Sequence, residues 1–147
     1  MAYIETAQRR LTILNCDPDV EFMRRAGDAL RAAGHHVLVA PDRSKAIELL
    51  LGGRRGVVIV PSVAFNRPES EHLAPFIHGL PERPAVIITM TLGRFDLAQQ
   101  AWQLGADEAV FKPLLDDTEL TDAVNRAMDK VAADESVERD KHNQQQR

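Results

Sequence analysis

Short apolar runs alternate with stretches of helical spacing along most of this chain. The helical stretches repeat apolar residues every three or four positions, as in Phe22, Ala26, Leu30 and Ala33. Five short runs are expected as strands: Leu11–Cys16, Val37–Ala40, Val57–Val60, Ala85–Thr89 and Glu108–Phe111. This alternation predicts βαβ units, and therefore an α/β fold in which helices cover both faces of a parallel sheet.

Capping residues mark the ends of the expected helices. Asp17 followed by Pro18 is typical of an N-cap and a first helical position, and Gly34 is typical of the stop after that helix. Asp116 with Glu119 resembles a capping box, which opens the last helix. The other expected helices are Ser44–Leu51, a short helix between residues 73 and 80 with Pro75 in its first turn, and Arg94–Leu104.

Three segments differ in their pattern. Residues 1–9 form an N-terminal extension, and residues 10–131 contain all the expected strands and helices. Residues 132–147 are polar, so we expect either a mobile, disordered tail or a frayed continuation of the last helix.

Composition and charge exclude several classes. With 147 residues, 44% hydrophobic and 27% charged, the chain fits one globular domain. A formal net charge of -4 argues against a general nucleic-acid or anionic-membrane surface. One cysteine cannot form an internal disulfide, and no apolar run approaches the roughly 20 residues of a membrane span. We therefore expect a soluble, cytoplasmic protein.

The strand ends carry the candidate chemistry, because ligands of open parallel sheets bind at the carboxyl ends of the strands. Four of these ends fall at Asn15-Cys16, Pro61, Thr89 and Lys112-Pro113, and none of them carries a carboxylate. Proline has no N–H to donate, so the third strand stops at or before Pro61.

Each remaining candidate has two interpretations. Lys112 either binds an anion together with Thr89 or pairs with Asp17, and the pair is favoured. Asp17 is expected to cap a helix rather than to act as a metal ligand or phosphoacceptor. Cys16 is expected to be an ordinary buried thiol rather than a reactive one. No zinc-ligand spacing, P-loop, dinucleotide-binding motif or nucleophile elbow occurs in the sequence.

Four segments resemble the receiver domain of bacterial two-component response regulators: ILNCDPDV, VVIV, PAVIIT and GADEAVFKP. The resemblance covers roughly residues 10–131, and the last segment is its most specific part. It implies a three-layer, flavodoxin-like (βα)5 fold, a doubly wound parallel sheet with strand order 2-1-3-4-5.

The resemblance also implies which residues occupy the phosphorylation site of the family. Thr89 matches the hydroxyl residue, Lys112 matches the lysine, and Pro113 matches the cis-proline that follows it. The other four positions depart from the family: the acidic pair falls on Asn15 and Cys16, the phosphoacceptor aspartate on Pro61, and the aromatic switch residue on Ala109.

These departures predict a pseudo-receiver. Mg²⁺ requires oxygen ligands, usually carboxylates, so we expect metal binding to be lost and no cofactor to be bound. Proline has no nucleophile that could form an acyl phosphate, so we expect no enzymatic phosphotransfer. The expected function is phosphorylation-independent signalling by protein–protein interaction.

The expected partner is a protein, either a histidine kinase, another signalling protein or a second copy in a homodimer. Nucleic acid and membranes are not expected as partners. The resemblance places the candidate interaction face on Phe95, Gln99, Gln100, Trp102 and Gln103. Two alternatives stay open: a residual phosphorelay receiver that uses Asp17 or a hydroxyl, and a flavodoxin-like binder of a small anion or cofactor at Thr89 and Lys112.

Overall fold

The chain forms one five-stranded, entirely parallel sheet of order β2-β1-β3-β4-β5. This order confirms the predicted flavodoxin-like, doubly wound fold. The computed structural model describes residues 10–53, 55–61, 73–91, 99, 102 and 105–145. The strands are β1 (Thr12–Asn15), β2 (His36–Val39), β3 (Val57–Pro61), β4 (Ala85–Thr91) and β5 (Glu108–Lys112).

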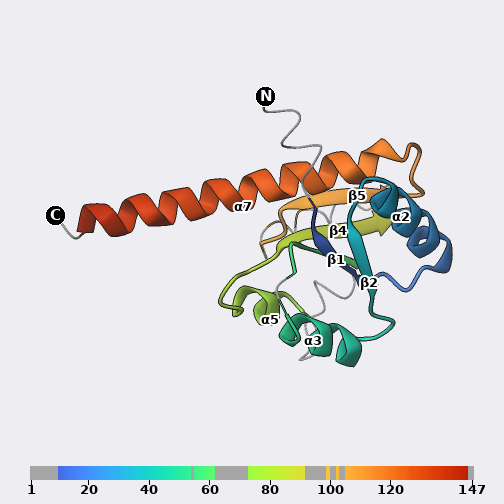
Figure 1. Cartoon of the computed structure of the whole chain (residues 1–147), viewed down its shortest axis with the longest axis horizontal. Helices are drawn as coiled ribbons and strands as arrows, with labels where there is room; N and C mark the ends of the chain where they lie inside the picture. Colours follow the sequence, from blue (N-terminus) through green and yellow to red (C-terminus); the bar gives the residue numbers. More distant parts are fainter. Residues whose placement is uncertain are drawn as a thin grey trace.

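Helices lie on both faces of the sheet, so the fold has three layers (Figure 1). The helices are α2 (Val20–Ala32), α3 (Arg43–Leu51), α5 (Ala74–His78) and α7 (Thr118–Gln145). Helices α2 and α7 cover one face, and α3 and α5 cover the other. Helix α5 is short, as expected from Pro75 in its first turn.

Two apolar cores separate the layers, because successive strand residues point to opposite faces of the sheet. Ile13 and Ile59 are fully buried in the core under α2 and α7, whereas their neighbours Leu14 and Val58 are fully buried in the core under α3. The central strands are therefore apolar on both sides, as expected for a parallel sheet covered by helices.

Helix α2 begins two residues later than the sequence predicts. Its N-cap is Asp19, whose Oδ1 accepts a hydrogen bond from the Phe22 main-chain N–H at 3.2 Å. The prediction that Asp17 caps this helix is wrong, because the Asp17 carboxylate is buried and bonded elsewhere. Gly34 follows the helix with φ +94°, a conformation that favours glycine, so the predicted stop is confirmed.

Helix α7 is much longer than its buried part. Val131 still packs in the core at 8% exposure, but the helix continues to Gln145 and projects beyond the sheet (Figure 1). Residues 132–145 are helical and continue α7. In the described part of the chain, no helix is long and apolar enough to cross a membrane.

The remaining boundaries differ by one or two residues from the predictions. Helix α3 starts at Arg43 with Asp42 as its N-cap, and β4 continues to Thr91. The expected helix Arg94–Leu104 lies mostly outside the described residues, where only Gln99 and Trp102 are described, both as helical.

Candidate functional site

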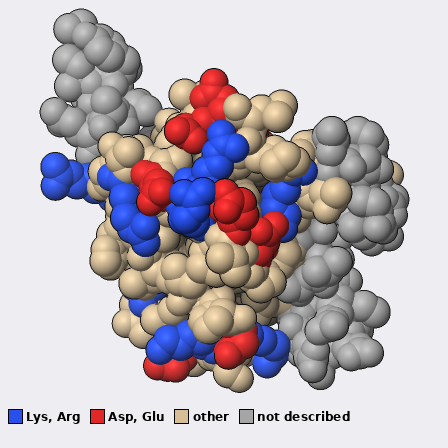
Figure 2. All heavy atoms as spheres, turned by 90° about the vertical axis from the view of Figure 1, so that its right-hand side faces the viewer, with Lys and Arg blue, Asp and Glu red and all other residues tan. Residues whose placement is uncertain are grey.

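The candidate site lies at the carboxyl edge of the sheet, which points to the right in Figure 1 and faces the viewer in Figure 2. The strand register places Pro61 beside Thr89 and Thr91 beside Lys112. Figure 2 shows Lys and Arg interleaved with Asp and Glu across the middle of this face. The described surface here is therefore of mixed charge.

The carboxylate of Asp17 lies at the centre of the site. Its side chain is fully buried, and its Oδ2 accepts a hydrogen bond of 2.5 Å from the Thr89 hydroxyl. The Lys112 Nζ lies 3.0 Å from Oδ2 and 3.3 Å from Oδ1. No described strand end itself carries a carboxylate, but the chain turns after β1 and brings Asp17 to the edge of the sheet, beside Thr89 and Lys112.

Two short turns hold this position. The Asn15 Oδ1 accepts a hydrogen bond from the Asp17 main-chain N–H at 3.1 Å, and Asp17 Oδ1 accepts one from the Asp19 N–H at 3.0 Å. These are the local bonds that Asn and Asp side chains form two residues along the chain. The Asn15 side chain is fully buried, and its Nδ2 has no hydrogen-bond partner among the described residues.

Lys112 also contacts the start of α2. Its Nζ lies 3.5 Å from Asp19 Oδ2 and 5.7 Å from the centroid of the Phe22 ring. The pKa of Asp19 is lowered, chiefly because its carboxylate accepts the Phe22 N–H bond and also because Lys112 is near. Lys112 therefore pairs with Asp17, the alternative that the sequence favoured, and reaches a second carboxylate at Asp19.

Cys16 is a neutral thiol in this setting. Burial, and secondly the neighbouring Asp17 carboxylate, raise the pKa of Cys16 to about 12. Because the thiolate is the nucleophilic form, this environment suppresses thiol chemistry at neutral pH. The geometry favours the ordinary thiol over the reactive one.

The remaining positions contribute shape rather than functional groups. Pro61 ends β3, and the Lys112–Pro113 peptide bond is cis, as the resemblance implies. Ala109, at the position of the aromatic switch residue, is half-buried on β5 beside Ile88 of β4. A methyl group there cannot act as a rotating ring.

The predicted interaction face is described only in part. Phe95, Gln100 and Gln103 lie outside the described residues. Gln99 is exposed and Trp102 is 50% exposed, and both are helical. Trp102 thus leaves half of its surface accessible.

Comparisons with known proteins rest on structure rather than sequence. No family profile matches the chain, and no curated protein matches it. Solved response regulators do share its fold. The fold is a receiver fold. The receiver domain protein from Clostridium thermocellum has 25% identity and a TM-score of 0.65, with 81% of this chain and 94% of that chain covered.

Two further receiver folds are similar at lower identity. The chemotaxis response regulator CheY4 of Vibrio cholerae has 18% identity and a TM-score of 0.68, over 81% of this chain and 99% of that one. NtrX from Brucella abortus has 19% identity and a TM-score of 0.75, over 88% of this chain. The chain spans only 30% of the length of NtrX.

One sequence signal could have revealed the buried carboxylate. The segment Asp17-Pro18-Asp19 holds two candidate caps, and only one of them is needed for α2. Asp19 takes that role, which leaves Asp17 available for the receiver-fold site.

Proposed function

We propose that the chain is a signalling module of receiver fold that acts through protein–protein contact, without aspartyl phosphorylation and without enzymatic activity. The observation that carries the proposal is which residues lie at the carboxyl edge of the sheet. Pro61 stands at the position that the resemblance assigns to the phosphoacceptor, and Lys112 and Thr89 are already bonded to Asp17. Proline offers no oxygen for an acyl phosphate.

The charges of the site also support metal-independent action. A divalent cation in an oxygen site needs carboxylates that are free to coordinate it. In the described part of this edge, Asp17 and Asp19 both lie against the Lys112 ammonium, at 3.0 and 3.5 Å. A bound cation would have to displace this lysine and then lie beside its positive charge.

The partner face remains the part of the proposal taken from the resemblance. It includes Phe95, Gln99, Gln100, Trp102 and Gln103, and the partner is a histidine kinase, another signalling protein or a second copy. The half-exposed indole of Trp102 supports this choice, because partly buried aromatic side chains frequently anchor interfaces.

Treatment with Mg²⁺ and acetyl phosphate, followed by intact-mass measurement, tests phosphorylation independence. We expect no added phosphoryl group. A mass gain that hydroxylamine removes would overturn the proposal and favour a residual phosphorelay receiver with Asp17 as acceptor.

A second experiment tests the protein contact. The full chain and its Trp102→Ala variant are compared as baits in native lysate, with Leu51→Ala as the control, because Leu51 is an exposed apolar residue on α3, outside the candidate face. We expect partners bound by wild type and by Leu51→Ala to be lost with Trp102→Ala. Equal capture by all three proteins would contradict the proposal that this face binds the partner.

The small-anion alternative predicts stabilisation by a free ligand. Because Asp17 already occupies Thr89 and Lys112, we expect phosphate, nucleotides and flavins to leave the melting temperature of the wild-type chain unchanged. An increase with any of them would favour a binding function.

A further inference from the structure

An apolar groove lies between the end of α3 and the connection from α5 to β4, elements that Figure 1 shows below the sheet. Because β3 and β4 begin just after the lining residues, the groove is at the amino edge, opposite the candidate site. Its volume of about 350 Å³ is near the lower limit for ligand sites. Its apolar lining consists of Leu50, Leu51, Leu80, Pro81 and Pro84.

The last turn of α3 exposes a leucine beside this groove. Leu49, Leu50 and Leu51 are consecutive, and successive helix residues are about 100° apart, so the three cannot all face the sheet. Leu50 is 5% exposed and packs in the core, whereas Leu51 is 68% exposed. A single exposed leucine is ordinary, but Leu51 adjoins the groove and extends its apolar surface.

Two residues of opposite charge line the same groove. Arg55 lies on the α3 side, where its Nε donates to the Leu49 carbonyl at 2.9 Å, and the exposed Glu82 lies in the α5–β4 connection. Gly53 lets the guanidinium lie against the chain, because a Cβ there would be 3.2 Å from Arg55 Nη1. The cation is therefore held at the end of α3.

We infer that this groove binds a second copy of the chain in a two-fold dimer. A two-fold interface presents the same surface on both sides. Leu51 of each copy then enters the apolar groove of the other, and Arg55 of each copy faces Glu82 of the other. A groove lined by one sign of charge would repel its copy, whereas the described lining carries one charge of each sign and is self-complementary.

The charge of Arg55 is suited to this contact. A guanidinium has several N–H donors, so Arg55 can hold the Leu49 carbonyl and a carboxylate of the second copy together. The groove shares no described residue with the face that includes Trp102. The inference therefore does not rest on the proposed function.

Analytical ultracentrifugation of the full chain at increasing concentration tests the dimer. Because the groove is small, we expect weak association, with a dissociation constant of about 10–100 µM. Leu51→Ala should raise this constant by about tenfold or more, since each dimer loses two buried leucines. The variant should fold, because Leu51 is exposed and alanine favours helix.

Leu115→Ala is the matched control, because Leu115 is 84% exposed but lies after β5, outside the groove. It should associate like wild type. A wild-type chain that stays monomeric at about 1 mM would overturn the inference. So would equal association by Leu51→Ala and wild type, or an equal loss in the control.

Exchanging the charges tests the two-fold arrangement. Arg55→Glu and Glu82→Arg each bring like charges together, so each alone should associate less than wild type. In an equimolar mixture, position 55 of each variant faces the opposite charge at position 82 of the other, so association should return. Circular dichroism checks that both variants fold, because Arg55 also bonds the end of α3. A mixture of folded variants that stays monomeric would overturn the inference.

Trp102→Ala separates this dimer from the contact in the proposed function. It should associate with itself like wild type, because Trp102 is not among the residues that line the groove. Self-association that is lost in Trp102→Ala and kept in Leu51→Ala would overturn the inference and leave the proposed function standing.

Discussion

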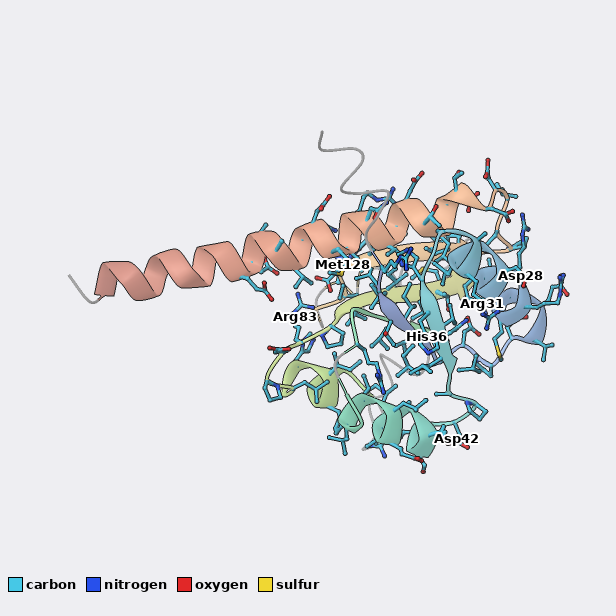
Figure 3. All side chains as sticks on the ribbon, in the orientation of Figure 1. Asp28, Arg31, His36, Asp42, Arg83 and Met128 are labelled. Carbon is cyan, nitrogen blue, oxygen red and sulfur yellow. The ribbon has the colours of Figure 1, made fainter. Side chains whose placement is uncertain are left out.

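Two buried aspartates lie at opposite edges of the same sheet, and each is paired with a cation. At the amino edge, Asp107 accepts two hydrogen bonds from Arg83, at 2.8 and 2.9 Å, and a third from the Val86 main-chain N–H at 2.8 Å. At the carboxyl edge, Asp17 accepts from Thr89 and Lys112. Figure 3 shows Arg83 beneath α7, on the left of the sheet, whereas Asp28 and Arg31 of α2 lie to its right.

The donors of the two aspartates differ in rigidity. Arg83 offers a planar, bidentate guanidinium, and Val86 offers a strand amide, so Asp107 joins the starts of β4 and β5. Arg83 also reaches Asp134 of α7 at 3.4 Å. Asp17 is bound by a hydroxyl and a flexible ammonium that has a second carboxylate nearby. Asp107 thus joins the starts of two strands, whereas Asp17 is bonded to the side chains of Thr89 and Lys112.

The largest effect should come from Asp107→Ala. It leaves the buried Val86 N–H without its side-chain acceptor and the Arg83 guanidinium with the Pro84 carbonyl and the exposed Asp134 carboxylate as its partners. We expect a loss of about 3 kcal/mol of unfolding free energy, measured by urea denaturation. A loss below that of Asp17→Ala would contradict the conclusion that Asp107 stabilises the sheet more than Asp17 does.

Asp17→Ala should cost less, about 2 kcal/mol by the same measurement. Among the described residues Asp17, unlike Asp107, accepts no hydrogen bond from a buried strand N–H, and Lys112 keeps the Asp19 carboxylate at 3.5 Å. A loss equal to that of Asp107→Ala would show that the two buried pairs stabilise the fold equally.

The thiol of Cys16, beside Asp17, predicts a pH dependence of stability. Its pKa is raised from 9.0 to about 12, so the unfolded chain ionises first. The contribution of Cys16 to stability is therefore fully present below pH 9.0 and is lost as the pH rises through about 12. Over this pH range the unfolding free energy of wild type, measured by urea denaturation, should fall more steeply than that of Cys16→Ala. If the unfolding free energies of the two proteins changed with pH in parallel, burial would not be raising the pKa of Cys16.

The smallest effect should come from Asp134→Ala. This carboxylate is 70% exposed and lies 3.4 Å from Arg83, so the pair is screened by water. We expect a change below about 0.5 kcal/mol in the unfolding free energy. A loss comparable with that of Asp107→Ala would mean that α7, rather than Asp107, holds Arg83 in place.

Most of the fold could be predicted from the chain, because strand and helix periods are local properties. The runs that include Ile13, Val58 and Ile87 are β-strands in the structure, with ends that differ by one or two residues. The end of α7 could not be placed in this way. Residues 132–135 are exposed, but residues 132–145 contain Ala132 and Ala133 and no glycine or proline, so the helix continues.

The site was predicted less completely than the fold. The residues at the strand ends, including Thr89, Lys112 and Pro61, follow from the chain and from its resemblance to receiver domains. The pairing of Lys112 with Asp17 was also the favoured alternative. The N-cap was assigned to the wrong residue, because Asp17 and Asp19 both satisfy the local rule for an N-cap.

By itself, then, the sequence determined the alternation of strands and helices, the two apolar faces of the sheet and the presence of Pro61, Thr89 and Lys112 at strand ends. Only the tertiary structure decided which aspartate caps α2 and which one enters the site. The reason is physical: a buried carboxylate is stable only where donors are already assembled, and those donors belong to β4 and β5, far along the chain from Asp17.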